Sequence, residues 1–433
     1  MKLRFFLIIW VFIFSPYVAL CTAILPKKVM FIAHTETING KGIYEIYQKM
    51  KEKGHQVTVF AIPDLKNDQL RHDLDLNFFQ KFDKNDVAFP CGKQKPYTQC
   101  ASIQNDRFDY AIIQNPYDSF KDSILETNFS LENIKKIAIK TAYIPYGPHI
   151  FHPATLNNTH LREKIDLVFV DSISTKNLYI EKLKFKPEKV EVVGYQTYKN
   201  VRDAKKLAES HADKKEFKET ILWMPRWTLH FKERELNEGG STFLSYYHFF
   251  YNYAKNNPNV QLIMRPHGST FPYAVESQFL SQDDVDEIVK KFESLKNVVV
   301  SSHSAIPLEQ DIMKADIVIS DGSSALGEAV VANKPIIYLS NGWDNEFKSN
   351  ELVGTLKNYI YMAHDPKEIL AFFDVIRKTN YYPFIEEDYE TLDHMKLEYY
   401  VAANKNNGRS ALKKILDPVD DPAAIITEYI SAH

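Results

Sequence analysis

Residues 315–335 have the sequence Ala-Asp-Ile-Val-Ile-Ser-Asp-Gly-Ser-Ser-Ala-Leu-Gly-Glu-Ala-Val-Val-Ala-Asn-Lys-Pro. The apolar run that ends at Ser320 is typical of a buried strand, Gly322 permits a tight turn, and the stretch 324–332 has helical spacing. We expect Ser323 or Ser324 to be the N-cap of that helix. This stretch therefore predicts a strand, a turn and a helix, which is the repeating unit of a parallel α/β sheet.

Similar apolar runs recur along the chain in two series. The first lies at 28–33, 54–61, 108–113, 138–144, 167–170 and 190–193, and the second at 220–224, 260–264, 298–301, 315–320 and 335–339. Stretches with helical spacing lie at 44–53, 242–254 and 283–292. The runs do not alternate strictly, which indicates sheets buried on both faces. We predict an α/β protein with two βαβ domains that face one cleft, where a ligand binds beyond the carboxyl ends of the strands.

Composition and charge limit the function classes. The chain has 433 residues, enough for two or three folded units, with 53 Lys+Arg against 56 Asp+Glu. The resulting net charge of -3 provides no broad basic surface, so we exclude nucleic acid as the main partner. The predicted domains are 27–199, a charged helical connector at 200–219, 220–385, and a helical tail at 386–433.

The N-terminal segment 1–26 is either a signal peptide or a membrane anchor. Lys2 and Arg4 precede an apolar run at 5–25, which is long enough to span a bilayer as a helix of about 20 residues. Pro16 interrupts this run, and small residues near Cys21 resemble a cleavage site. Both alternatives stay open. The other two cysteines, Cys91 and Cys100, can pair if the chain is exported.

Several residues of the second domain are suited to holding phosphate. The Gly322-Ser323-Ser324 turn opens a helix, where free N–H groups favour an anion, and Glu328 on the same helix can accept a ribose hydroxyl. In Met-Arg-Pro-His-Gly at 264–268, Arg265 offers a planar set of donors and His267 can exchange a proton. Arg226, in Trp-Met-Pro-Arg-Trp at 223–227, can add a second cation. The alternatives are an ordinary serine cap and solvated loop side chains.

In the first domain, His34 begins a polar loop after the first strand, and His149 follows the strand and loop at 138–147. The loop after His34 is not a dinucleotide fingerprint, because Glu45 occupies the place of the third glycine. The spacing of His149, His152 and His160 matches no zinc pattern and has no cysteine partners, so we expect no metal site.

Seven motifs together resemble the CDP-glycerol glycerophosphotransferase family, the teichoic-acid polymerase and primase group. They occur in the family's order and spacing: Tyr-Ile-Pro-Tyr-Gly at 143–147, Val-Gly-Tyr at 193–195, Ile-Leu-Trp-Met-Pro-Arg-Trp-Thr at 221–228, Gly-Ser-Thr-Phe at 240–243, Ile-Met-Arg-Pro-His at 263–267, Ile-Ser-Asp-Gly-Ser-Ser at 319–324 and Asn-Lys-Pro at 333–335. The resemblance covers about 143–338 and extends weakly to 407–412.

The resemblance implies a GT-B fold, with Rossmann-like acceptor and donor domains. It also implies that the second domain holds a nucleotide-diphosphate donor through Ser323 and Ser324, with His267 as the histidine of the Arg-x-His motif. One departure affects the catalytic base. Tyr146 stands where the teichoic-acid enzymes have a histidine, so His149 or His34 is the alternative base.

The leading hypothesis is a transferase that moves a glycerophosphate or glycosyl group to a hydroxyl acceptor in cell-surface polymer or glycan synthesis, without a cofactor. The alternatives are a hexosyltransferase or nucleotide-sugar epimerase of the same fold, and a two-lobed solute-binding protein. Because activated nucleotides are cytoplasmic in bacteria and polymer acceptors are membrane-linked, we expect a membrane-associated body at the cytoplasmic face. Export after cleavage of the signal peptide is the alternative location.

Overall fold

The structure is a computed structural model of the chain. It describes residues 25–34, 42–66, 69–72, 74–103, 105–114, 126–145, 147, 159–210, 216–227, 240–302, 306–340, 360–378 and 419–433. The predicted N-terminal apolar helix lies outside these residues. Within the described ranges, none of the helices has both the length and the apolar character required to cross a bilayer.

The first lobe is built on a parallel sheet in the order β5-β2-β1-β6-β7-β8-β9. Successive side chains of β1 point to opposite faces of the sheet and pack in separate cores. Met30 and Ile32 belong to the core on one face, and Phe31 and Ala33 belong to the core on the other. The strands are β1 Lys28–His34, β2 Gln56–Ile62, β5 Val87–Ala88, β6 Phe108–Ile113, β7 Ala138–Tyr143, β8 Leu167–Val170 and β9 Val190–Val192, and a hairpin is formed by β3 Asp64–Lys66 and β4 Gln69–His72.

Helices cover both faces of this sheet, as a parallel sheet requires. They are α2 Ile43–Glu52, α3 Leu76–Phe79, α4 Glu126–Phe129, α5 Leu131–Ile137, α6 Thr159–Lys164 and α7 Ile173–Glu181, with the short 3-10 helix η2 Pro187–Lys189. Helix α2 packs on the sheet through one apolar face. Its side chains Ile43, Ile46 and Met50 recur at helical spacing and are buried.

The second lobe has its own parallel sheet, in the order β12-β11-β10-β13-β14-β15. Its strands are β10 Glu219–Met224, β11 Val260–Met264, β12 Val298–Val300, β13 Ile317–Ser320, β14 Ile336–Leu339 and β15 Tyr361–Ala363. Its helices are α9 Phe243–Asn256, α10 Thr270–Glu276, α11 Gln282–Glu293, α12 Leu308–Lys314, α13 Leu326–Val331 and α15 Pro366–Lys378. Trp223 of β10 is fully buried, and its indole lies 4.4 Å from the ring of Phe250 in α9.

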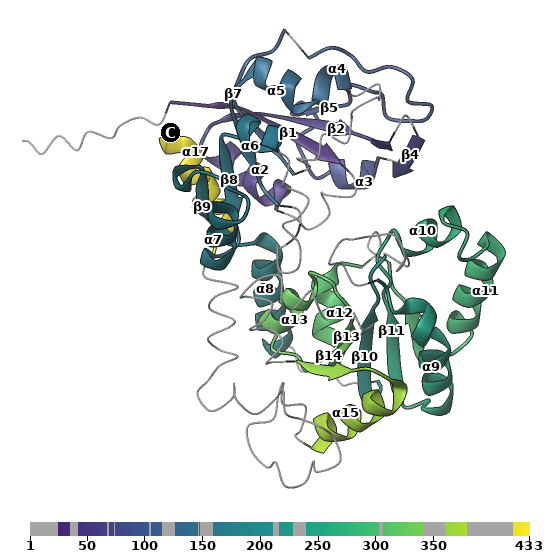
Figure 1. The fold of residues 1–433 in the computed structure, drawn as a ribbon. Coiled ribbons are helices and arrows are strands. Elements are labelled where there is room, and N and C mark those ends of the chain that lie inside the picture. The colour runs from purple at the N-terminus through teal and green to yellow at the C-terminus, as the bar shows by residue number, and fades with distance from the viewer. Residues whose placement is uncertain are drawn as a thin grey trace, which may run out of the picture.

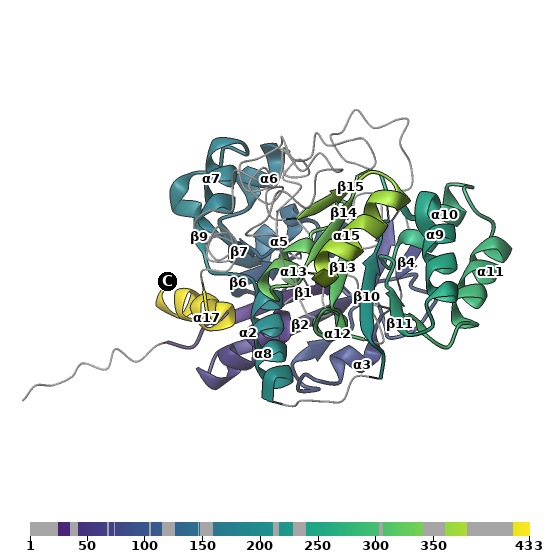
Figure 2. The same ribbon diagram turned by 90° about the horizontal axis from the view of Figure 1, so that it is seen from below.

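One helix lies between the lobes, and the last helix packs on the first lobe. Figure 1 shows α8 (Gln196–Ser210) between the two sheets, and Tyr198 and Val201 of α8 pack in the same core as Ile312 and Leu326 of the second lobe. The last helix, α17 (Pro422–Ala432), lies beside the first lobe in both views (Figures 1 and 2). The chain thus crosses from the first lobe to the second and returns.

Candidate active site

Three motifs that are far apart in the sequence meet at one edge of the second sheet. Strand β10 lies between β11 and β13 and is parallel to both, so the carboxyl ends of all three point the same way. Arg226 follows β10, Arg265 follows β11, and the turn with Ser323 follows β13. This is the edge at which open parallel sheets bind ligands.

Asp321 holds two of these loops together and was not predicted from the sequence. Its fully buried carboxylate accepts hydrogen bonds from the backbone N–H of Arg226 at 2.8 Å, the backbone N–H of Thr242 at 2.8 Å and the Thr242 hydroxyl at 2.9 Å. Burial raises the pKa of Asp321, while these donors and the nearby charge of Arg226 oppose the rise. Asp321 therefore fixes the loop after β10 and the start of α9 against the serine turn.

The predicted serine N-cap is wrong by one or two residues. Helix α13 begins at Leu326 and its N-cap is Ala325, which makes no side-chain cap. The two serines form a turn before the helix, because the Leu326 N–H donates to the Ser323 carbonyl at 3.2 Å and the Gly327 N–H donates to the Ser324 carbonyl at 3.0 Å. The buried Gly322 precedes this turn, in which Ser323 is half-buried and Ser324 is exposed.

Arg265 lies in a buried ion pair. Its Nη1 is 2.5 Å from Asp311 Oδ2 of α12 and donates to Ser301 Oγ at 3.0 Å, and the Ser301 hydroxyl also bonds to Asp311. The Arg265 and Asp311 side chains are only 2% and 1% exposed. The charge of Arg265 is therefore neutralised by Asp311 of the same lobe. The role of Arg265 toward a ligand stays a prediction.

Two further residues of the predicted phosphate site, Arg226 and His267, lie in the loops that follow β10 and β11. Arg226 is buried, and its charge is near enough to Asp321 to oppose the rise that burial causes in the pKa of that carboxyl. His267 is half-buried, and its Nδ1 accepts the Ser269 N–H at 3.1 Å. This contact places the proton of the neutral imidazole on Nε2, which makes Nε2 a hydrogen-bond donor.

The first lobe approaches the serine turn through the loop after β7. A Cβ atom built on Gly147 would lie 3.6 Å from Ser324 Oγ. Tyr146 and His149, two of the predicted bases, lie outside the described residues. His34 ends β1, but its side chain is also outside the description. The structure thus brings Gly147, which follows β7, close to the serine turn of the second lobe, and the catalytic base stays a prediction.

Gly147 lies where the first lobe approaches the second. A methyl group there would make only ordinary van der Waals contact, so Gly147→Ala is expected to leave the lobe spacing unchanged. Gly147→Phe overfills the space and is expected to disfavour the closed arrangement by about 1–3 kcal/mol. Small-angle X-ray scattering checks this through a larger radius of gyration for Gly147→Phe alone. Equal radii for the two variants would contradict the prediction.

A second group of polar residues joins the lobes at the start of α8. Tyr195 follows β9 and is buried, and its pKa is raised by burial and then by the carboxylates of Glu328 and Asp171. Glu328, predicted as a ribose ligand, is buried in the first turn of α13. The side chain of Tyr195 is therefore within electrostatic reach of one carboxylate from each lobe.

Asp171 makes stability depend on pH. Burial raises the pKa of Asp171 from 3.8 to about 6, although the hydroxyls of Thr175 and Ser172 and a backbone hydrogen bond oppose part of this rise. The native state then binds this proton more tightly than the unfolded state. From about pH 4 to pH 6, the contribution of Asp171 to the free energy of unfolding is expected to fall by about 3 kcal/mol.

Asp171→Asn removes the titrating group and is expected to remove this component of the pH dependence. Urea denaturation from pH 4 to pH 8 measures it as the difference between the two proteins. If the free energy of unfolding of both proteins follows the same pH curve, Asp171 is not the titrating group.

Comparisons with known proteins place the fold. No family model and no curated protein sequence matches the chain. Among solved structures, the UDP-GlcNAc 2-epimerase of Neisseria meningitidis bound to UDP-GlcNAc is similar with a TM-score of 0.55 and 13% identity, covering 94% of this chain and 100% of that chain. The S. aureus MnaA–UDP structure has a TM-score of 0.52 and 12% identity, covering 93% of this chain and 96% of that chain. The wall teichoic acid polymerase TagF has a TM-score of 0.51 and 12% identity, covering 95% of this chain and 90% of that chain.

These identities are low, so the likeness concerns the fold alone. The chain has two parallel α/β sheets in the arrangement of the GT-B class, as the sequence resemblance implied.

Proposed function

We propose that the protein is a GT-B transferase that binds a nucleotide-diphosphate donor on the second lobe. The observation that carries the proposal is the meeting of the loops after β10, β11 and β13 at one sheet edge, opposite the first-lobe loop at Gly147. The similar structures bound to UDP-GlcNAc or UDP are consistent with a nucleotide ligand. The Ser323-Ser324 turn and Arg226 would contact the donor phosphates, and Glu328 would accept a ribose hydroxyl.

In the proposed reaction, an acceptor hydroxyl held by the first lobe attacks the donor. With a CDP-glycerol-type donor, its oxygen bonds to the distal phosphorus and CMP leaves. With a sugar nucleotide, it bonds to the anomeric carbon and the nucleoside diphosphate leaves. The His267 Nε2–H would stabilise the departing phosphate, and a first-lobe base, His34, Tyr146 or His149, would take the hydroxyl proton. The acceptor, including a membrane-linked one, is part of this proposal.

A second candidate function is epimerisation of a nucleotide sugar. Two of the similar structures favour it, since one is a UDP-GlcNAc 2-epimerase and another binds UDP. Product analysis separates the two functions. A transferase releases nucleotide only when an acceptor is present or hydrolysis occurs, whereas an epimerase returns an intact nucleotide sugar with altered stereochemistry.

Nucleotide binding by the full chain tests the proposal. We expect CDP-glycerol or UDP-GlcNAc, at about 100 times its dissociation constant, to stabilise the protein by about 2.7 kcal/mol in thermal denaturation. Ser324→Asp sets a carboxylate against the phosphates and is expected to weaken binding about tenfold or more.

The matched control is Ser294→Asp, which changes an exposed serine at the end of α11, outside the site. It should leave nucleotide affinity unchanged. If neither CDP-glycerol nor UDP-GlcNAc nor their free nucleotides stabilise the wild type, the transferase proposal fails and a solute-binding protein becomes the better hypothesis.

A further inference from the structure

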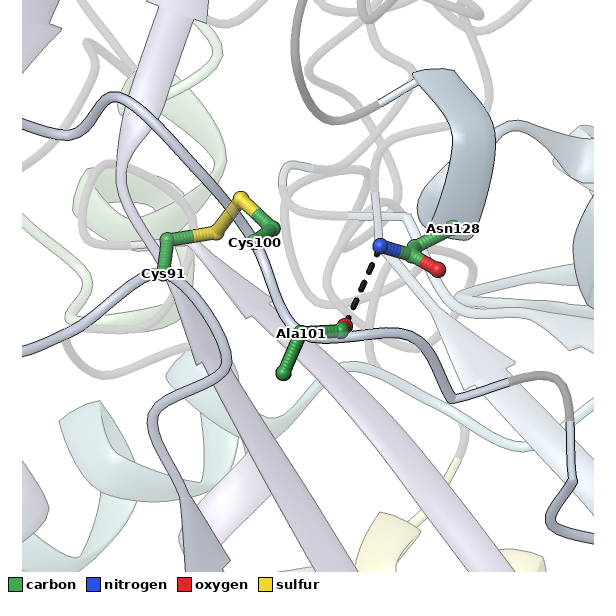
Figure 3. Close-up of a disulfide and its surroundings, with 4 residues drawn as sticks. All are labelled: Cys91, Cys100, Ala101 and Asn128. Carbon is green, nitrogen blue, oxygen red and sulfur yellow. Dashed lines mark hydrogen bonds between the residues drawn. A yellow bond between two sulfur atoms is a disulfide. The ribbon is translucent and has the colours of Figure 1, made fainter.

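A disulfide joins Cys91 and Cys100 in the segment between β5 and β6 (Figure 3). Cys91 is 6% exposed and belongs to the core on one face of the first sheet, together with Phe60 and Phe108. Cys100 is half-buried against the same core. Because Cys91 is packed within a hydrophobic core, a reductant would reach its sulfur only after local opening. The burial favours a structural crosslink over an exposed redox switch.

The surrounding backbone is ordered by the same crosslink. The Ala101 N–H donates to the Pro90 carbonyl at 2.8 Å, so the residues next to the two cysteines are also hydrogen-bonded to each other. The Asn128 side-chain amide then donates to the Ala101 carbonyl at 3.1 Å, as Figure 3 shows. The disulfide segment is thereby attached to α4.

This contact also occupies a glycosylation sequon, Asn128-Phe129-Ser130. The nitrogen that would carry a glycan is the donor to Ala101, Phe129 is in the core, and Ser130 caps α5 by accepting the Asn133 N–H. Asn128 is only 3% exposed, so a glycan on its side-chain nitrogen is incompatible with this fold.

The number of cysteines in the sequence is also consistent with an oxidising compartment. The chain has three cysteines, and the third, Cys21, lies in the apolar N-terminal segment, so the body of the chain has no unpaired cysteine. Structural disulfides form and persist in oxidising compartments, whereas the cytosol keeps thiols reduced. The apolar run at 5–25 provides a means of entering a membrane.

We infer that the body of the protein folds on the oxidising side of a membrane. This differs from the cytoplasmic face that we expected because activated nucleotides are cytoplasmic in bacteria. Closing the bond removes two electrons and two protons from the Cys91 and Cys100 thiols. A protein disulfide of that compartment accepts them and is reduced to its dithiol. The inference rests on the cysteines and their burial, and a transferase on that side of the membrane would need a compartment supplied with nucleotide donors.

Thiol trapping of the full chain in the cells that produce it tests the inference. Cells are quenched in acid, free thiols are blocked, and the protein is then reduced under denaturing conditions and labelled with a maleimide polymer. We expect two labels that appear only after reduction. Cys21→Ser should keep both labels, and the double variant Cys91→Ser/Cys100→Ser should lose both.

A result in which Cys91 and Cys100 are already blocked before reduction would overturn the inference. The trapping is carried out on the wild-type chain, so it stays decisive even if the double variant does not fold. Nucleotide binding is measured separately on the purified protein. Loss of that binding with the disulfide intact refutes the transferase proposal alone, whereas free thiols with nucleotide binding intact refute only the compartment.

Discussion

Asp311→Ala is expected to lower the free energy of unfolding by about 3–5 kcal/mol, because it leaves the Arg265 guanidinium buried without a counter-charge. The Ser301 hydroxyl loses its acceptor in the same variant. Denaturant unfolding of the full chain measures the effect as a shift of the midpoint. A loss below about 1 kcal/mol would mean that Arg265 is compensated by other groups.

The double variant Arg265→Met/Asp311→Leu is the control for this experiment. Replacing a buried ion pair with apolar side chains of similar volume is often neutral or stabilising, so the double variant should recover most of the lost stability. Its nucleotide affinity then tests the sequence prediction for Arg265. Binding that is unchanged in this folded variant would remove Arg265 from the phosphate site and confine it to a structural role.

Asp321→Asn is expected to weaken nucleotide binding by about 10- to 100-fold, which corresponds to about 1.4–2.7 kcal/mol. An asparagine keeps one oxygen acceptor, but its NH2 group faces donors where Asp321 accepted the Thr242 N–H and hydroxyl. The start of α9 is then no longer hydrogen-bonded to the turn after β13. Isothermal titration with the nucleotide that stabilises the wild type measures the change.

Asp316→Asn is the matched control for Asp321→Asn. Asp316 also joins β13 to β10, because its Oδ2 accepts the Thr220 N–H at 2.9 Å, but it does so at the amino ends of the strands. Both variants should lose some stability, and only Asp321→Asn should lose affinity. If both variants lose affinity equally, Asp321 acts through general stability and not through the site.

Most strands were predictable because they are buried on both faces. The runs at 108–113, 167–170 and 260–264 match β6, β8 and β11, and continuous apolar character distinguishes such strands from surface segments. The two residues of β5 and the three of β15 were missed. Strands this short carry no periodicity, and only pairing with β2 and β14 defines them.

The meeting of the three motifs at one sheet edge was predictable, but the contacts within the candidate site were not. Parallel strands place their carboxyl ends at one edge, so the motifs at 226, 265 and 322–324 had to meet there. Asp311 and Asp321 were missed because their function depends on partners distant in sequence, such as Arg265 and Thr242. The serine cap was misplaced because a turn of the same composition can precede a helix as readily as begin it.

The residues that precede α17 lie beside α8, the helix between the lobes. Arg202 of α8 donates through Nη2 to the carbonyls of Val419 at 3.0 Å and Asp420 at 2.7 Å, just before α17 begins. A hinge movement of the lobes would therefore have its axis near α8. Separation of the lobes would then be smallest beside Tyr195 and greatest at the rim farthest from α8. A ligand that contacts both lobes at this rim would favour closure of the lobes most strongly. A ligand bound beside α8 would leave the angle between the lobes almost unchanged.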